Sequence, residues 1–392
     1  MTDPAGSVLD RAHGIVDDRT LSSVQAWKEQ HPGALAIGYM PIYVPRPFLE
    51  AIGCLPVALF GGGDGIDIIR GDSYFQSYIC HIPRSTVELA LSGNLASLDG
   101  VLFPSICDVI RNLGGMWKML FPEVYATYVD LPQNFDPEVG GAFYVREMER
   151  IARELRERGA RPMEPAALAK AIGAENARRE AISELDAFRR EEPWRCKASE
   201  AYLIVRAGAV LETTVHTALI RDFLAAARER KGRPVDNVRV VISGSFCEQP
   251  PLELIRALEK SGCDIVDDDF QLGMRMIDGP IEVRGSEDPL VALSRAYLEH
   301  GRATASRYIG DLVKGASLIS RVRSHRAEGV IFAAASFCDP ALLDQPMIEA
   351  ALTRAGVPHT SFKFSENMGQ FQVIREQAGA FSDAVKLWGA AS

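Results

Sequence analysis

The chain has 392 residues, of which 47% are hydrophobic and 24% are charged, so it can bury the cores of two or three domains. Its net charge of −9 and isoelectric point near 5.4 exclude a general binder of nucleic acid or anionic membranes, because no basic surplus exists to neutralise phosphates. The N-terminus shows no basic segment followed by an apolar run, and no stretch of 18 uncharged apolar residues occurs. We therefore expect a cytoplasmic protein without a signal peptide or a membrane span.

Short apolar runs alternate with helical patterns in the first third of the chain. Helices are predicted over residues 46–53 and, after Pro83, up to residue 93. Strands are predicted over residues 34–41, over 54–60 ahead of a glycine turn, over 100–104 and over 124–132. Alternating strands and helices are typical of a parallel sheet covered by helices.

The middle of the chain changes character. Residues 143–230 are rich in charge with helical spacing, and the strand–helix pattern resumes only at residue 237. In this second part, strands are predicted over 237–244, from Cys263 onward, over 329–335 and over 357–365, with a helix between the first two.

The two α/β parts resemble each other. "AIGYMPIYVPRPFLEAIGCLPV" and "VISGSFCEQPPLELIRALEKSGCDIV" both read as strand, glycine, loop, proline, helix, Gly-Cys and strand, and "DGVLFPSICD" matches "EGVIFAAASFCD". The alternative is that all α/β units look alike. We predict two doubly wound, flavodoxin-like α/β domains, at residues 31–142 and 233–392, with ligands at the carboxyl ends of their strands. Residues 1–30 are expected to form a helical lead-in, and residues 143–232 a separate helical segment.

Three cysteines stand where α/β folds place their chemistry. Cys107 and Cys338 each follow a predicted strand, and Cys80 lies in a loop before a helix. Three thiolates converging from such loops would suit an iron–sulfur cluster with one iron left open, although a single cysteine is more often a small buried hydrophobic residue. Asp108 and Asp339, directly after two of these cysteines, are expected to cap the following helices rather than to react.

The other four cysteines receive different predictions. Seven cysteines is an odd number, and in a reducing compartment a disulfide framework is not expected. No C-x-x-C pair occurs, so any metal site must be assembled from distant segments. Cys54 and Cys263 occupy matching Gly-Cys positions and are assigned to packing, as is Cys196. Cys247, in "GSFCEQPP", follows a strand and is a candidate fourth ligand.

Several of these stretches together resemble a known family. "YMPIYVPRPFLEAIGCLPV", "SYICHIPRS", "LFPSICDVIRNL", "FAAASFCDP" and the closing "GQFQVIREQAGAF" are similar to the 2-hydroxyacyl-CoA dehydratase and benzoyl-CoA reductase family. The resemblance covers nearly the whole chain. Within the family, "GDSYFQSYICHIPRSTVELALSG", "GSFCEQPP" and "FAAASFCDPALLDQP" look most like the smaller, gamma-type, cluster-bearing subunit of ATP-dependent benzoyl-CoA reductases.

The resemblance implies a cofactor and partners. It implies a [4Fe-4S] cluster held by Cys80, Cys107 and Cys338, a related cluster-bearing subunit, ATP-hydrolysing activase subunits, ferredoxin as electron donor and an aromatic acyl-CoA substrate. ATP is expected to act in the partners, because "LFGGGDG" at residues 59–65 lacks the G-x-x-x-x-G-K-[ST] pattern of a phosphate-binding loop. The resemblance leaves open whether the ring reacts at this chain's cluster or at that of the sister subunit.

Four further side chains are candidates for roles at this site. His81, beside Cys80, and Glu248, beside Cys247, are the candidate catalytic residues. For the histidine, the alternative is a position on the surface or behind the residues that hold the cluster. Arg84 and Arg111 are candidates to pair with coenzyme A phosphates, with solvated salt bridges as the alternative.

Three functions are compatible with these patterns. The first is an iron–sulfur subunit of an aromatic acyl-CoA reductase, and the stretches "GSFCEQPP" and "AAASFCDP" favour it. The second is a subunit of a 2-hydroxyacyl-CoA dehydratase, a lyase that uses one electron catalytically. The third is a non-catalytic scaffold whose cysteines are redox-inert.

Overall fold

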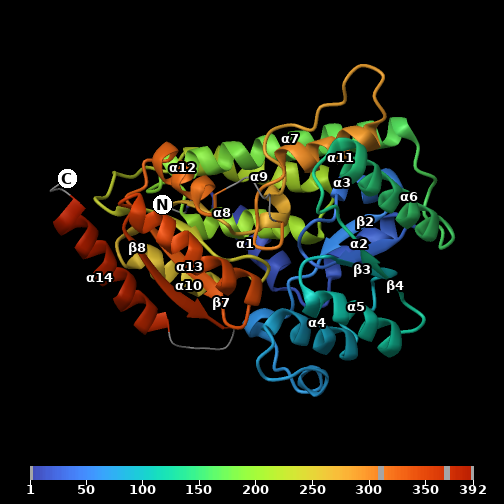
Figure 1. Ribbon diagram of the computed structural model, residues 1–392, viewed down its shortest axis with the longest axis horizontal. Coiled ribbons are helices and arrows are strands. Elements are labelled where there is room, and N and C mark those ends of the chain that lie inside the picture. The colour runs from blue at the N-terminus through green and yellow to red at the C-terminus, as the bar shows by residue number, and fades with distance from the viewer. Residues whose placement is uncertain (1–2, 308–312, 366–370, 390–392) are drawn as a thin grey trace.

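The computed structural model describes residues 3–307, 313–365 and 371–389. Within these residues, eight strands form two separate sheets of four, and all the strand pairs are parallel (Figure 1). The first sheet has the order β2-β1-β3-β4 and the second has the matching order β6-β5-β7-β8. The predicted fold class, two doubly wound α/β units, is therefore confirmed.

The central strands are short, largely apolar segments because both faces of each sheet are covered by helices. β3 and β7 are buried at every position, which is typical of parallel strands. All eight lie within or close to the ranges predicted from the sequence. The strands are β1 (Ala36–Tyr39), β2 (Leu55–Ala58), β3 (Gly100–Pro104), β4 (Tyr125–Val129), β5 (Val238–Ser243), β6 (Cys263–Asp268), β7 (Gly329–Ala335) and β8 (His359–Phe364).

The helices of the first unit lead from one strand to the next. α4 begins at His81 and not after Pro83 as the sequence suggested, because the first-turn amides of a helix have no partner within it and a proline there costs no hydrogen bond. The helices of this part are α1 (Gly6–Asp17), α2 (Ser22–Gln30), α3 (Arg46–Ala51), α4 (His81–Leu91) and α5 (Asp108–Leu120).

The charged middle segment forms four helices that bridge the two units. α7 has 27 residues, begins with Pro165, and packs against α9, against α3 of the first unit and against β6 of the second. It runs along one side of the molecule over both sheets (Figure 1). The four helices are α6 (Ala142–Arg156), α7 (Pro165–Glu191), α8 (Ala198–Ala207) and α9 (Thr213–Arg228).

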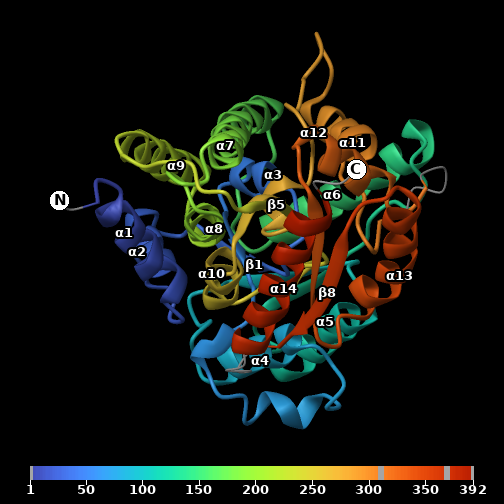
Figure 2. The ribbon, with the colours of Figure 1, turned by 90° about the vertical axis from the view of Figure 1, so that its left-hand side faces the viewer.

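The second sheet is covered on both faces, as the alternation of its side chains requires. Val330 and Phe332 of β7 pack with Leu318 of α12 and Leu352 of α13, whereas Ile331 belongs to the main core. Figure 2 views this unit with α14, β8 and α13 in front. The helices are α10 (Leu252–Lys260), α11 (Pro289–His300), α12 (Ala316–Ser324), α13 (Asp339–Arg354) and α14 (Phe371–Gly389). Among the described residues, no helix is long and apolar enough to span a membrane.

Each sheet has a switch point, where the chain leaves two neighbouring strands in opposite directions. In the first sheet these strands are β1 and β3, and in the second they are β5 and β7. Crevices at the carboxyl ends of such strand pairs are where open α/β sheets bind their ligands. The loops after these four strands carry Tyr43, Cys107, Cys247 and Cys338.

Acid is expected to destabilise the second unit through Asp267. Burial raises the pKa of this carboxyl group, but the guanidinium of Arg321, which lies 2.6 Å away, and the nearby Arg189 and His325 hold the pKa well below its ordinary value. Such a group stabilises the fold fully above its unfolded pKa of about 4, and this stability is lost as the pH falls toward the lower, folded pKa.

Urea unfolding midpoints, measured from about pH 7 to about pH 3, test this expectation. Replacing Arg321 by methionine should lower the midpoint at neutral pH and flatten its fall below about pH 5. The control is Arg256→Met, because both Arg256 and its partner Glu253 are exposed. An unchanged pH dependence in Arg321→Met would contradict the assignment.

Candidate functional site

Three cysteines occupy the N-cap positions of three helices. Cys80 precedes α4, Cys107 precedes α5 and Cys338 precedes α13. The first amides of a helix point out of its N-terminus and have no partner within it, so they stabilise an anion placed there. Burial raises the pKa of the Cys107 thiol, and the backbone amides of Ile110 and Val109 act in the opposite direction by favouring the thiolate. The two loops that join strand to helix thus present sulfur atoms to an electropositive environment, as does the loop before α4.

The sulfur of Cys338 is stabilised in the same way, by the backbone amide of Ala341. Asp108 and Asp339 are the first residues of their helices, so the cysteines and not the aspartates are the N-caps, which corrects the expectation from the sequence. The aspartates place negative charge in the first helical turn, where it interacts favourably with the positive end of the helix dipole.

Four thiols from both units lie close enough to influence one another. Burial, followed by the charges of Cys338, Cys107 and Cys80, raises the pKa of the Cys247 thiol well above its ordinary value. Burial likewise raises the pKa of Cys107 and Cys80, and raises that of Cys338 to about 12. Because burial disfavours thiolates, these groups ionise together only when a cation shares the site.

The site has chemical features that suit a sulfur-ligated metal cluster. Within the described residues, no three His, Cys, Asp or Glu side chains are arranged to hold one metal ion. In an iron–sulfur cluster each protein thiolate binds a different iron, so the ligand sulfurs need not meet at one point. Soft sulfur donors, backbone amides directed at them and a largely buried position match what such a cluster requires.

Glu248 joins the two units at this site. Its side chain is 2% exposed, and its Oε2 accepts a hydrogen bond of 3.1 Å from the backbone N–H of His81, the first residue of α4. Its charge also raises the pKa of Cys80 and of Cys338. Glu248 thus lies near the cysteines, as the sequence predicted. Its carboxylate also contacts the N-terminus of α4, a helix of the other unit.

His81 is buried rather than on the surface, since its side chain is only 8% exposed. Burial, reinforced by the charge of Arg84, lowers the pKa of the imidazole to about 4. The ring is therefore neutral at neutral pH. The alternative of a surface histidine, considered from the sequence, is wrong.

The two candidate phosphate-binding arginines have partners within the chain. Arg84 donates a hydrogen bond of 2.8 Å to Asp72, and Arg111 lies over the ring of Tyr128, 5.8 Å from its centroid. The salt-bridge alternative therefore holds for Arg84. Cys54, Cys196 and Cys263 lie in the main hydrophobic core, which confirms their assignment to packing. All seven cysteines are free thiols.

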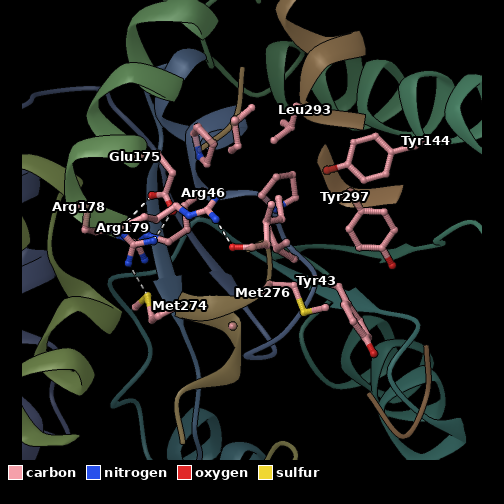
Figure 3. A pocket seen from close by; sticks show the side chains of 16 residues that line it. Tyr43, Arg46, Tyr144, Glu175, Arg178, Arg179, Met274, Met276, Leu293 and Tyr297 are labelled. Atoms are coloured by element: carbon pink, nitrogen blue, oxygen red, sulfur yellow. Dashed lines mark hydrogen bonds and ion pairs between the residues drawn. The ribbon is translucent and has the colours of Figure 1, made fainter. Parts of the chain in front are cut away.

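An open pocket lies between the first unit, α7 and the 3₁₀ turn Leu272–Arg275, and its space, including the solvent at its mouth, is about 490 Å³. Figure 3 shows Arg178 and Glu175 at one end, and Tyr43, Tyr144 and Tyr297 at the other. Burial raises the pKa of the Tyr43 hydroxyl, and a smaller contribution comes from the charge of Cys247, so Tyr43 lies within electrostatic range of that cysteine. Tyr43 was not among the site residues predicted from the sequence. The signal that could have found it is its place in the loop just after β1. The predicted strand ended at residue 41, whereas β1 ends at Tyr39, so the start of this loop was misplaced.

Comparison with known proteins agrees with these features. Residues 41–385 match the family described as 2-hydroxyglutaryl-CoA dehydratase, D-component. The chain is 46% identical to a benzoyl-CoA reductase subunit from Thauera aromatica, over 97% of this chain and 98% of the relative. It is 23% identical to the (R)-phenyllactyl-CoA dehydratase beta subunit of Clostridium sporogenes, over 91% of this chain and 93% of the relative.

A third relative is the (R)-2-hydroxyglutaryl-CoA dehydratase subunit beta of Acidaminococcus fermentans, which is 26% identical over 91% of this chain and 94% of the relative. These relatives are subunits of larger enzymes. The resemblance inferred from the sequence motifs is confirmed. The chain belongs to the 2-hydroxyglutaryl-CoA dehydratase D-component family.

Proposed function

We propose that this chain is an iron–sulfur subunit of an oxidoreductase of the benzoyl-CoA reductase type, which reduces an aromatic acyl-CoA to a cyclic dienoyl-CoA. The observation that carries the proposal is the meeting of Cys80, Cys107, Cys247 and Cys338 between two similar α/β units. The identity of 46% over nearly the whole chain to a benzoyl-CoA reductase subunit supports the same reaction class.

Cys80, Cys107 and Cys338 are the proposed ligands of a [4Fe-4S] cluster. All three are thiols at the N-cap of a helix. Cys247 lies instead in the loop before α10, and in this proposal it is a thiol that neighbours the cluster without binding it. When bound, the cluster would supply an electron of low potential to the substrate. The amides of Val109, Ile110 and Ala341 would stabilise the sulfur atoms that hold it.

The remaining residues of the site act by position and by excluding water. Adding an electron to a benzenoid ring removes its aromatic stabilisation, so the reduced ring must be shielded from oxidants and from uncontrolled protonation. Cys247, Cys338, Glu248 and His81 are all buried, and the site lies where the two units close on each other. In this proposal the hydrogen bond of Glu248 to the N-terminus of α4 fixes the position of the first unit relative to the loop after β5.

The proposed enzyme has further components and a cytoplasmic location. A related cluster-bearing subunit would pair with this chain, and activase subunits reduced by ferredoxin would hydrolyse ATP. The subunit names of the relatives support a hetero-oligomer. The second candidate is a 2-hydroxyacyl-CoA dehydratase subunit, which relatives of 23–27% identity favour.

Anaerobic co-production with the neighbouring subunits tests the proposal. We expect a brown, oxygen-sensitive complex with about four iron atoms in this chain. A reductase consumes ATP with each electron pair transferred to benzoyl-CoA, whereas a dehydratase needs ATP only for occasional priming and eliminates water from a 2-hydroxyacyl-CoA. Colourless protein without iron, purified anaerobically, would rule out both and support a scaffold.

A further inference from the structure

Tyr43 occupies the place in the first unit that Cys247 occupies in the second. β1 ends at Tyr39 and β5 ends at Ser243, so each residue lies four positions beyond its strand, in the loop that borders the switch point. Burial is the main cause that raises the pKa of Tyr43, and the charge of Cys247 is a minor one, so the two residues lie within electrostatic range of each other across the junction of the units.

The backbone at Tyr43 is held in an unfavourable conformation. Its φ is +73°, in the left-handed region that a bulky aromatic residue rarely adopts. Such strain persists only where the surroundings enforce it, and it concentrates at functional sites. Here the loop is pressed against Gly273, where a β-carbon would lie only 1.9 Å from the carbonyl oxygen of Pro41. Placing Tyr43 in this conformation therefore costs conformational energy, which the rest of the fold must offset.

The hydroxyl group of Tyr43 is hydrogen-bonded to two other hydroxyls, one of which lies nearer the surface. Tyr43 Oη is hydrogen-bonded to Thr304 Oγ1 and lies 2.8 Å from Ser306 Oγ. Tyr43 and Thr304 are buried, whereas Ser306 is half-buried. Because each hydroxyl both donates and accepts, the three groups can pass a proton from the surface to the interior.

The loop that carries these hydroxyls is firmly anchored. The guanidinium group of Arg307, which is 1% exposed, donates hydrogen bonds to the carbonyl oxygens of Tyr297 at 2.7 Å and Leu298 at 2.9 Å. Both acceptors lie in α11, so Thr304 and Ser306 are fixed relative to that helix. Figure 3 shows Tyr43 at the end of the cavity away from Arg178 and Arg179, with its hydroxyl directed away from them.

We propose that Tyr43 donates a proton to the reduced acyl group bound beside the cysteines, and that Thr304 and Ser306 return a proton to it from solvent. This inference rests on the proposed function and places the reacting ring at this chain. Reduction of one ring double bond takes two electrons, from the low-potential iron–sulfur donor, and two protons. In the step assigned to Tyr43, its O–H bond breaks, a C–H bond forms on the ring, and the phenolate is then reprotonated from solvent through the neighbouring hydroxyls. The second proton of the reduction is taken from water.

A phenol suits this step chemically. Burial raises the pKa of Tyr43, so its hydroxyl stays protonated until a strong base forms beside it. A reduced aromatic ring carries charge on carbon and is far more basic than a phenolate, so the transfer is favourable. A stronger acid in the same place would take the low-potential electron itself and release hydrogen. The weak acidity of Tyr43 thus directs both electron and proton to the ring.

The test is Tyr43→Phe in the assembled complex, with benzoyl-CoA as substrate. The variant keeps the ring that lines the cavity and removes only the hydroxyl. We expect unchanged iron content, an unchanged dissociation constant for a non-reducible acyl-CoA analogue and a KM within about twofold of wild type, but a kcat lower by about 100-fold or more. The residual rate should show a larger solvent deuterium isotope effect than the wild type. The matched control is Tyr125→Phe, which removes a buried hydroxyl bonded to Glu154 at 2.7 Å, on the outer strand β4.

A second variant tests the relay without touching Tyr43. Thr304→Val combined with Ser306→Ala should lower kcat in the same direction with iron and analogue binding retained. Wild-type kcat in Tyr43→Phe, in an active complex, would overturn the proposal and leave the proposed function standing, as would equal losses in Tyr43→Phe and Tyr125→Phe. If Tyr43→Phe loses iron, wild-type kcat in the double variant overturns the relay. A wild-type complex that reduces no aromatic acyl-CoA overturns both proposals.

Discussion

Replacing Cys107 by serine is expected to remove most of the iron, from about four atoms in this chain to fewer than about one, together with all acyl-CoA reduction. A serine hydroxyl is a harder and less readily ionised donor than a thiol, so it binds the soft iron–sulfur core poorly. The amides of Val109 and Ile110, which favour a thiolate at this position, would face a neutral hydroxyl instead. Iron analysis and the visible absorption of anaerobically purified complex measure the result.

The matched control is Cys54→Ala. Cys54 is also buried, but it lies in the main core at the start of β2 and is assigned to packing. Its loss should cost stability and leave the iron content per folded chain unchanged. Cys107→Ala serves as a second variant that offers no replacement ligand. Full iron content in both Cys107 variants would exclude this residue as a ligand and would remove the main support for the cluster.

Replacing Arg189 by methionine is expected to lower the free energy of unfolding by about 3–5 kcal/mol. Arg189, on α7, pairs with Asp268 at the end of β6, and both side chains are 1–2% exposed. Asp186 and Arg275 complete a buried group of two acids and two bases, in which Arg275 lies 2.9 Å from Asp186. Removing one base leaves two buried carboxylates that share a single cation.

Urea unfolding followed by circular dichroism gives the measurement. The control is Arg228→Met, because Arg228 of α9 pairs with Glu184 of α7 but both side chains are nearly half exposed, and such pairs contribute at most about 1 kcal/mol. Adding Asp268→Leu to Arg189→Met should recover much of the loss, since the uncompensated charge is then gone. Equal losses in the Arg189 and Arg228 variants would show that the buried group does not hold α7 to the second sheet.

Local patterns in the sequence were sufficient for the strands and for the relation between the two units. The central strands are short apolar runs, and burial on both faces of a parallel sheet selects such runs regardless of the rest of the chain. The positions of Cys107 and Cys338 after matching strands follow from the same patterns, because a residue directly beyond a parallel strand lies at the ligand-binding edge of its sheet. The predicted start of α4 was two residues too late, because Pro83 was taken as the start of a helix that begins at His81.

Contacts between distant segments required the tertiary structure. The hydrogen bond from the amide of His81 to Glu248 joins residues 167 positions apart, and that between Tyr43 and Thr304 joins residues 261 positions apart. Neither pair has a local periodicity that would predict it. The replacement of the expected aspartate caps by cysteine caps at α5 and α13 depends on backbone angles that side-chain identity alone does not determine.

By itself, the sequence therefore determined the α/β class, the repeat, the family and the three cysteines that follow the family pattern. These are properties of neighbouring residues and of residue types. Only the tertiary structure decided that Cys247 joins the other three thiols, that His81 is buried and neutral, and that Tyr43 faces the same junction. The physical reason is that burial and electrostatic coupling arise between side chains that the fold brings together, and no single segment of the chain contains both partners.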